Sequence, residues 1–460
     1  MYPLNAQPEM VDAKQSARIR QARALLWLGA FMPIIYTVGK GVDEVGGVGP
    51  LEIIRGGGGL ALFFFVTIGM RVPATRPLRN GLTEAGLFFF VAMASLSALW
   101  SVDPRLTILK LVPLVTTYLC LAKLSTLYIS IQETIRGIVT VAHSILLATL
   151  VQLAVWPSRT YSTDNFGQEP RIHSVLPAIA SNLFGLIAGI GIAAICLKIG
   201  PKWTTRAPWN ILLVLVYFVL LLGTRSRVVT LVSLIIIILC LVRAMHRSQH
   251  ANILGWFGAT AAVAGGWWAW TRDDIKVVVA EFVLRGQDEQ GLSTLTGRTV
   301  IWDRVPALIT GDEWWGWGYY AGHRVGLPAR DSLFRGYSNL DNTWIESVVG
   351  VGLLGAGGLA VFMLFGTIRT IKATRGMGSY RLFAVLLTLG VTGLTLINPT
   401  VQTNTSTLVF FAIIVFTTRA LKEESPPLAC ANRHQFIPTE LDNALAGADK
   451  RDLSRSPAFR

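Results

Sequence analysis

The sequence has few charged residues for its length. Asp, Glu, Lys and Arg make up 15% of 460 residues, whereas soluble domains average about 25%. Hydrophobic residues make up 52%, and the mean hydropathy is +0.51. This composition excludes an ordinary soluble protein. It predicts an integral membrane protein, whose length does not imply several soluble domains.

Cysteines, repeats and long basic tracts are also scarce. The four cysteines have neither metal-site spacing nor the pattern of a disulfide framework, and no repeat of fixed period occurs. The net charge is +14, but the basic residues form short clusters between apolar runs, as in cytoplasmic loops. Nucleic acid is therefore not an expected partner. No cleavable signal peptide is expected, because the first apolar run lacks a small-residue cleavage site.

The sequence does contain many apolar runs, and a membrane-spanning helix needs about 20 such residues. We expect an all-α integral membrane protein with about twelve transmembrane helices. Glycines 56–59 could open the short second run as a re-entrant or tilted piece. The runs lie near residues 24–39, 57–71, 84–100, 106–127, 133–156, 174–197, 209–223, 228–244, 252–270, 343–367, 382–398 and 404–421.

Clusters of Lys and Arg predict the orientation. With twelve spans the clusters all fall on one side, which the positive-inside rule makes the cytoplasm. Both termini are then cytoplasmic, and the long polar segment before the tenth run is external. The clusters are Lys14, Arg18, Arg20 and Arg23; Arg71, Arg76 and Arg79; Lys198, Lys202 and Arg206; Arg243 and Arg247; Arg369, Lys372, Arg375 and Arg381; Arg419 and Lys422.

The chain therefore divides into five segments. Residues 1–23 form a cytoplasmic N-terminal segment, and residues 24–270 a membrane domain of about nine spans. Residues 271–342 form an external loop with short helices, and residues 343–421 a membrane domain of about three spans. Residues 422–460 are polar and lack an apolar period, which predicts a disordered cytoplasmic tail.

Two arginines lie in the tight outer turn between the seventh and eighth runs. Arg225 and Arg227 lie on the outer side, where the positive-inside rule disfavours arginine. A charge there is energetically costly unless it is paired or solvated. Guanidinium groups suit phosphate oxygens, so this turn is a candidate anion clamp. The alternative interpretation is snorkelling of both side chains at a helix end.

The external loop contains a short amphipathic pattern that Thr296 can cap. Arg298 would lie in the first turn of this helix, against the preference of the helix dipole, which indicates an anionic partner. The alternative is a solvated surface arginine. The pattern continues through Ile301 to Trp302.

An aromatic, glycine-rich stretch follows at residues 311–320. Trp314, Trp315 and Trp317 could offer flat apolar faces beside hydrogen-bonding groups, as sugar-binding surfaces require. They could equally form an aromatic belt that rests on the bilayer.

Asp341 and Asn342 open the tenth run. Asp at a helix N-terminus is an ordinary N-cap; the alternative is a general base that takes a proton from a sugar hydroxyl. His323 is the only histidine in the external loop and is a second candidate base, although a lone loop histidine is more often incidental.

Two further polar turns have structural interpretations. Asp103-Pro104 can end one helix and start the next, so we favour a cap beside a belt tryptophan, Trp100, over the rim of a cavity. Ser181-Asn182, after Arg171-Ile172-His173, can form an interhelical hydrogen bond or touch a lipid headgroup.

These segments, in this order, resemble the O-antigen ligase and Wzy-type polysaccharide polymerase superfamily, over residues 95–421. In the family the last motif usually reads His-Asn, nine residues, Gly, two residues, Gly, and the spacing here is the same. The matching segments are Trp100-Ser101-Val102-Asp103-Pro104, Ser181-Asn182, Ser226-Arg227, Gly297-Arg298 with Ile301-Trp302, Gly316-Trp317-Gly318, and Asp341-Asn342 followed by Gly352-Leu353-Leu354-Gly355.

The resemblance implies a GT-C-like membrane glycosyltransferase that uses undecaprenyl-diphosphate-linked glycans without a metal or another cofactor. It implies that Arg227 and Arg298 face the diphosphate and that a catalytic histidine stands at position 341. This chain departs from the pattern with Asp341. Asp341 could be the base, since a carboxylate with its ordinary pKa near 4 is ionised; His323 could have taken over; or the site is not a ligase site.

The missing histidine makes us expect a polymerase. It would join lipid-linked repeat units into exopolysaccharide, capsule or O-antigen on the periplasmic face of the bacterial inner membrane, with inversion at the anomeric carbon. Arg225, Trp302 and Asn342 are further expected substrate contacts. The expected partners are the lipid-linked donor and acceptor and the bilayer, with a chain-length regulator as a candidate.

Two other functions compete with the polymerase. A ligase would use the same site to join a finished glycan to a different acceptor. A transporter would do no bond chemistry, but the sequence lacks charges placed mid-span in paired spans and lacks an inverted repeat.

Overall fold

The computed structural model describes most of the chain between residues 13 and 415. The described residues are 13–31, 50–71, 81–127, 130–162, 170–175, 178–179, 181–199, 209–245, 272, 298–335, 340, 342–396 and 411–415. All of these residues belong to one compact unit. The predicted ninth span and the predicted disordered tail lie outside the described residues.

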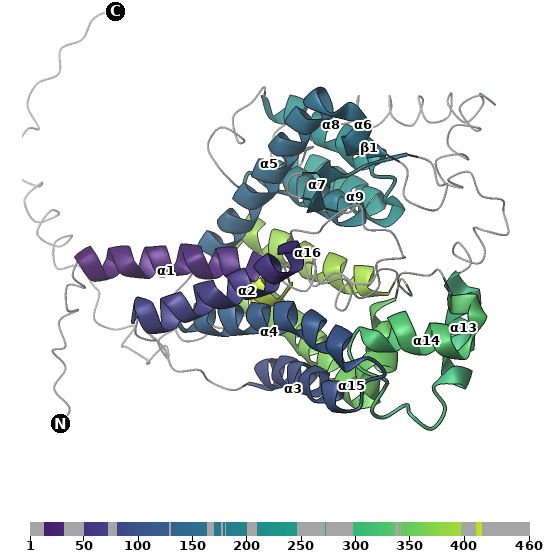
Figure 1. Ribbon diagram of the computed structural model, residues 1–460. Coiled ribbons are helices and arrows are strands. Elements are labelled where there is room, and N and C mark those ends of the chain that lie inside the picture. The colour runs from purple at the N-terminus through teal and green to yellow at the C-terminus, as the bar shows by residue number, and fades with distance from the viewer. Residues whose placement is uncertain are drawn as a thin grey trace, which may run out of the picture. The chain divides into compact units, whose positions relative to one another are not determined.

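Nearly all of the described residues are helical (Figure 1). The helices are α1 (Ala13–Phe31), α2 (Pro50–Phe64, continued by a π-helical turn at Phe65–Gly69), α3 (Leu82–Leu96, continued by a 3-10 turn at Ser97–Leu99), α4 (Pro104–Thr126), α5 (Ile131–Val155), α6 (Pro157–Thr160), α7 (Ser181–Cys196), α8 (Trp209–Gly223), α9 (Arg227–Met245), α13 (Arg298–Leu308), α14 (Leu327–Arg330), α15 (Thr343–Ala373) and α16 (Ser379–Thr395).

Four helices of the described part are long and apolar enough to cross a membrane: Leu82–Leu99, Pro104–Thr126, Ile131–Val155 and Thr343–Ala373. Shorter apolar helices lie at Gly57–Gly69, Ser181–Cys196, Trp209–Gly223, Val229–Ile238 and Ser379–Thr395. The chain is thus a mostly helical membrane protein. The count of twelve spans and the GT-C-like arrangement remain predictions.

The second predicted run differs from the structure. Helix α2 begins at Pro50, so glycines 56–59 lie inside the helix instead of opening it. Glycine is intrinsically unfavourable in a helix, but small residues let neighbouring helices approach closely in a membrane. A Cβ at Gly29 of α1 would lie 3.4 Å from the carbonyl oxygen of Gly59. Close packing of α1 on α2 therefore accounts for the glycines.

The sixth predicted run was placed too early, because α7 begins only at Ser181. The preceding residues form two small antiparallel sheets: β1 (Tyr161–Ser162) pairs with β2 (Arg171–Ile172), and β3 (Ser174–Val175) pairs with β4 (Ala178–Ile179). A short apolar stretch does not distinguish strand from helix by composition, so the sequence pattern missed these strands.

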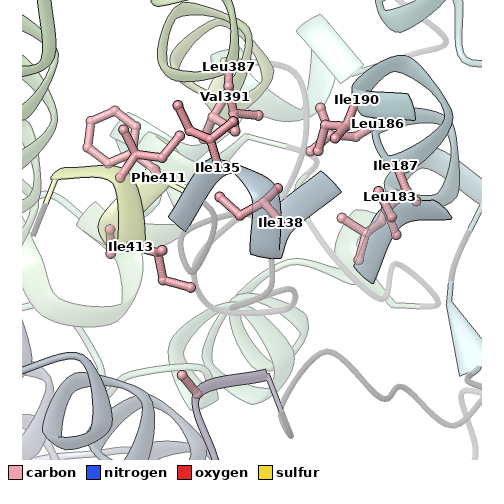
Figure 2. Packing of buried hydrophobic residues seen from close by; sticks show 14 of the residues in the cluster. Ile135, Ile138, Leu183, Leu186, Ile187, Ile190, Leu387, Val391, Phe411 and Ile413 are labelled. Atoms are coloured by element: carbon pink, nitrogen blue, oxygen red, sulfur yellow. The ribbon is translucent and has the colours of Figure 1, made fainter. Parts of the chain in front are cut away.

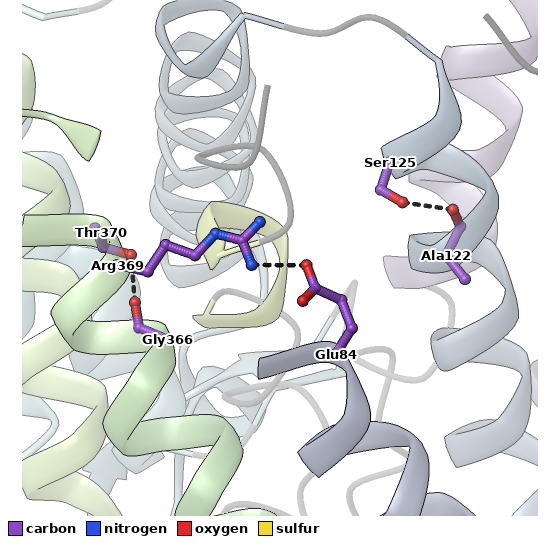
Figure 3. Close-up of polar contacts among 6 residues, drawn as sticks. All are labelled: Glu84, Ala122, Ser125, Gly366, Arg369 and Thr370. Atoms are coloured by element: carbon purple, nitrogen blue, oxygen red, sulfur yellow. Dashed lines mark hydrogen bonds and ion pairs between the residues drawn. The ribbon is translucent and has the colours of Figure 1, made fainter. Parts of the chain in front are cut away.

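Helices α3 and α15 pack closely along their length. A Cβ at Gly86 would lie 2.8 Å from the carbonyl oxygen of Gly358, so these two glycines bring the backbones together. At the other end of α15, Arg369 donates to the buried carboxylate of Glu84 at 2.7 Å, as Figure 3 shows. The glycine contact and the ion pair together fix α15 against α3.

The main apolar core contains residues of α5, α7 and α16 (Figure 2). Ile135 and Ile138 of α5 lie near Leu387 of α16 in this view, and Leu186 and Ile187 of α7 lie on the other side. Helix α5 contacts both α7 and α16. The core thus connects the helices before the α8–α9 turn with the helix that follows α15.

Candidate active site

Helix α15 is interrupted at Gly352, where the backbone leaves the helical conformation with φ 71° and ψ 179°. This region of backbone space is essentially restricted to glycine. A side chain at this position would also collide with the carbonyl oxygen of Trp314. Gly352 therefore marks the place where the loop before α15 contacts the interrupted helix.

The loop replaces the hydrogen bonds that the interruption removes. In a regular helix the amide of residue 353 would bond to the carbonyl of residue 349. Instead, Leu353 N donates to Glu313 O at 2.7 Å, and Val349 O accepts from Trp317 N at 2.8 Å. The carbonyl of Gly350 accepts from Gly318 N at 2.9 Å. Irregular backbone inside a membrane protein requires such internal partners.

The turn between α3 and α4 holds the loop from the other side. Val102 N donates to Trp317 O at 3.0 Å, and Trp100 Nε1 donates to Trp315 O at 3.2 Å. Asp103 caps α4, since its Oδ1 accepts from Leu106 N at 3.0 Å. The capping interpretation of Asp103 is therefore confirmed. The turn also has a second role, anchoring the loop, which its sequence did not reveal.

Helix α13 carries Arg298 as its first residue, so the expected short helix is confirmed. Thr296, its predicted cap, lies outside the described residues. Trp302 lies one turn after Arg298, on the same helix face, and its Nε1 donates to Leu340 O at 2.7 Å. This bond ties the helix of Arg298 to the residue that precedes position 341.

The backbone on both sides of position 341 is held, while Asp341 itself lies outside the described residues. Leu340 N donates to Glu346 Oε1 at 3.0 Å. The N-cap of α15 is Asn342, whose Oδ1 accepts from Trp344 N at 2.9 Å and Ile345 N at 3.1 Å. The capping position is thus one residue later than we expected. This removes the ordinary capping explanation for an aspartate at 341.

Helix α16 meets the same region with its C-terminal end. Leu396 O accepts from Asn342 Nδ2 at 3.1 Å, and Thr395 Oγ1 accepts from Trp344 Nε1 at 3.1 Å. Helix α16 also contacts α5, α7 and α9. It therefore links the start of α15 to the helices that carry the arginine turn.

The arginine turn packs on α7 and β2. Arg225 has a left-handed backbone, φ 54°, which is uncommon for a residue other than glycine. Arg227 begins α9. A Cβ at Gly185 of α7 would lie 3.0 Å from Ser226 Cβ, so the small residue lets the turn sit against the helix. Such strained backbone is concentrated at functional sites.

The three loop tryptophans have different surroundings. Trp314 is 58% exposed and Trp315 is 54% exposed, and the Trp315 ring meets Trp100 edge-on at 5.9 Å between centroids. Trp317 is only 4% exposed, and the guanidinium of Arg330 lies 3.5 Å from its ring centroid. Only Trp314 and Trp315 present open ring surface in this structure, and Trp317 packs in the core of the loop.

His323 lies in a π-helical segment, Gly322–Gly326, and is 3% exposed. Its ring meets Tyr320 edge-on at 5.0 Å between centroids. Tyr320 has φ 63°, and Lys110 Nζ of α4 lies 5.0 Å from its ring centroid. The burial of His323 separates it from a large acceptor, which weakens its candidacy as the base.

Burial raises the pKa of Tyr319, and the nearby Glu346 and Tyr320 raise it further. Tyr319 therefore stays protonated and neutral. Its backbone joins α3 to α4, since Tyr319 N donates to Ser97 Oγ at 2.9 Å and Tyr319 O accepts from Thr107 Oγ1 at 3.0 Å. The tyrosine is a buried anchor of the loop.

Glu346 is not among the site residues expected from the sequence. An acidic residue inside an apolar span is energetically costly and is a functional candidate by default, and this signal was present in the sequence.

Of the other polar candidates, Arg171 and His173 are buried, with His173 Nδ1 3.4 Å from Arg171 O. Among the described residues no group of His, Cys, Asp or Glu could hold a metal ion.

Comparison with known proteins bears on the same segment of the chain. Residues 211–360 match the model of a protein family described as O-antigen ligase. A search of curated proteins finds no match. The matched residues contain the arginine turn, α13, the docked loop and the interrupted part of α15. Residues 211–360 of this membrane protein are thus similar to the O-antigen ligase family, which is consistent with the O-antigen ligase and Wzy-type superfamily.

Proposed function

We propose that the protein polymerises undecaprenyl-diphosphate-linked repeat units into a surface polysaccharide on the periplasmic face of the bacterial inner membrane. The bond between Trp302 Nε1 and Leu340 O, 2.7 Å, carries this proposal. It joins the helix that presents Arg298 to the backbone next to Asp341. This link supports a site in which Arg298 binds phosphate and Asp341 is the base.

The donor diphosphate lies against Arg227 and Arg298, with Arg225 in support. Guanidinium groups bind phosphate oxygens with a forked geometry. As the anomeric carbon–oxygen bond breaks, its electron pair leaves with the lipid diphosphate, and the arginines stabilise the charge that develops there. The match to a family of enzymes named for ligation of a glycan supports this placement.

The acceptor hydroxyl attacks the anomeric carbon from the opposite face, and its proton passes to Asp341. A candidate base must come within hydrogen-bond reach of that hydroxyl. The burial of His323 favours Asp341 over His323. One displacement of this kind inverts the anomeric centre and needs neither a metal nor another cofactor. Trp314 and Trp315, which are exposed, are the sugar-stacking candidates.

A ligase is the second candidate, because the matched family is described as O-antigen ligase. Ligase and polymerase share the donor and the chemistry and differ only in the acceptor. The aspartate at position 341, where the related ligases carry histidine, is our reason for preferring the polymerase. A transporter without bond chemistry is less well supported, because it does not require this family match.

Gene deletion distinguishes these functions when the glycans left on the lipid carrier are sized. We expect single repeat units to accumulate and long surface polymer to disappear, with recovery by the wild-type gene but not by Asp341→Asn. Long chains retained on the carrier would identify a ligase instead. Unchanged carrier glycans and unchanged surface polymer would refute both functions.

A further inference from the structure

Glu346 is a fully buried acid in the first part of α15, with an exposed fraction of 0%. It stands four residues after the N-cap Asn342, and its side chain reaches back past the cap to Leu340 N at 3.0 Å. A capping box usually returns a side chain to the amide of the cap residue itself. Here the side chain holds an amide two residues further back.

This bond fixes a peptide that would otherwise be costly. Leu340 is 2% exposed, so an unbonded amide there would remain away from water. Its carbonyl is held separately by Trp302 Nε1. Both polar groups of Leu340 therefore have fixed partners from two different helices, α15 and α13. The neighbouring cap bonds of Asn342 fix the chain on the other side of position 341.

Burying an acid at this depth is unfavourable unless it forms compensating interactions. A location near the N-terminus of α15 helps, because the helix dipole favours an acidic group there. The bond to Leu340 N satisfies the buried carboxylate and the buried amide together. It also fixes the backbone immediately before position 341, the place of the candidate base.

We propose that Glu346 is a positioning residue that fixes the Leu340 peptide, the backbone immediately before the candidate base at position 341. This role rests on the proposed function. It acts through the hydrogen bond to Leu340 and not through its charge. Glu346→Gln keeps a side chain of the same length with an acceptor oxygen but removes the charge. Glu346→Asp keeps the charge, but its side chain is too short to accept from Leu340 N. The two substitutions therefore separate the explanations.

The test compares Glu346→Gln, Glu346→Asp and Glu346→Ala with wild type in lipid nanodiscs. Backbone amide exchange is measured for the peptide that contains Leu340. Transfer is measured with the lipid-linked glycans extracted from the deletion strain. Ser347→Ala is the matched control, because Ser347 is equally buried on the same turn and its Oγ has no hydrogen-bond partner within the described part of the chain.

We expect Glu346→Ala and Glu346→Asp to exchange this amide roughly tenfold faster, since a buried donor loses its acceptor. Turnover should fall about 100-fold with KM unchanged, as for a misplaced reacting group. Glu346→Gln and Ser347→Ala should match wild type in both measurements. A thermal unfolding midpoint for each variant shows whether a loss of activity is due to unfolding. If Glu346→Ala does not fold, the comparison of Glu346→Gln with wild type still tests the proposal.

Three results would overturn the positioning role. Wild-type exchange in Glu346→Ala would show that the bond does not hold the peptide. Wild-type turnover in Glu346→Ala would show that the bond is not needed for transfer. If Glu346→Gln protects the Leu340 amide from exchange but loses turnover, the carboxylate of Glu346 is required and not only its hydrogen bond. If wild-type protein transfers no glycan, the proposed function fails and the positioning role with it, whatever the exchange results are.

Discussion

The amide of Leu353 donates to the carbonyl of Glu313 at 2.7 Å, and not to Val349 within its own helix. This exchange of hydrogen-bond partners docks the loop before α15 onto that helix. Two segments that resemble family motifs therefore pack against each other: Gly316-Trp317-Gly318 and Gly352-Leu353-Leu354-Gly355. Near it, Trp302 and Glu346 hold Leu340.

Gly352→Ala should disrupt the docking of the loop on α15. The substitution forces an L-residue into a region that only glycine occupies readily, at a cost of about 2 kcal/mol or more, and adds a collision with Trp314 O. We expect a lower unfolding midpoint in detergent and faster proteolysis of residues 311–320. Gly357→Ala is the control, because a Cβ there meets nothing within 4 Å. Equal stability of the two variants would contradict the docking role.

Arg298→Ala should lower glycan transfer by about 100-fold or more, because one stabilising group for the developing charge is lost. Arg298→Lys should recover only part of the activity, since lysine keeps the charge but not the forked geometry. Polymer length and amount on the cell surface measure the effect. Arg304→Ala is the matched control on α13, with a side chain that is 65% exposed. Full polymer output from Arg298→Ala would refute the clamp.

Trp302→Phe removes one hydrogen bond and keeps most of the apolar ring. Leu340 O then loses its donor, and we expect turnover to fall roughly tenfold, the effect of one unsatisfied buried partner. Steady-state transfer assays on purified protein give the number. Trp209→Phe, at an exposed position on α8, should leave transfer unchanged. An unaffected Trp302→Phe enzyme would mean that the link between α13 and position 341 is not needed.

Trp317→Ala should lower stability, whereas Trp314→Ala should weaken substrate binding. Truncation of the buried Trp317 should destabilise the protein by about 4 kcal/mol, because its ring packs beneath Arg330. Trp314→Ala should leave the unfolding midpoint unchanged and raise the KM for the lipid-linked glycan. Chemical unfolding and substrate titration separate the two effects. If Trp314→Ala leaves KM unchanged, the aromatic-belt interpretation of that residue is preferred.

Glu84→Gln should weaken the packing of α3 on α15. Removing one partner of a buried ion pair leaves the other charge uncompensated, at a cost of about 3 kcal/mol, and the Arg369–Glu84 distance is 2.7 Å. Unfolding in mixed detergent micelles measures this loss. Glu133→Gln is the control, because the Arg23–Glu133 pair is longer, 3.8 Å, and half exposed. Its loss should cost less than about 1 kcal/mol.

Hydrophobic runs and turn residues alone placed most of the described helices. Trp209–Gly223 was predicted with the same bounds, and α4 and α5 were placed within two residues at each end. Local chemistry suffices there, because a long apolar run and a strong cap such as Asp103-Pro104 determine a membrane helix without help from the rest of the chain. The match of residues 211–360 to the O-antigen ligase family agrees with the resemblance that the sequence motifs indicate.

The sequence by itself determined a membrane protein, the short helix at Arg298 and the similarity of residues 211–360 to the O-antigen ligase family. Only the tertiary structure decided that Asn342 caps α15, that Trp317 is buried and that Glu346 holds Leu340. The burial of Trp317 depends on hydrogen bonds between segments that are distant in sequence, and apolar periodicity carries no information on such pairing. The bonds of Asn342 and Glu346 are local, but periodicity does not show which polar side chain bonds which backbone group. The break at Gly352 becomes interpretable only with the loop in place, because its backbone partners come from residues 313–318.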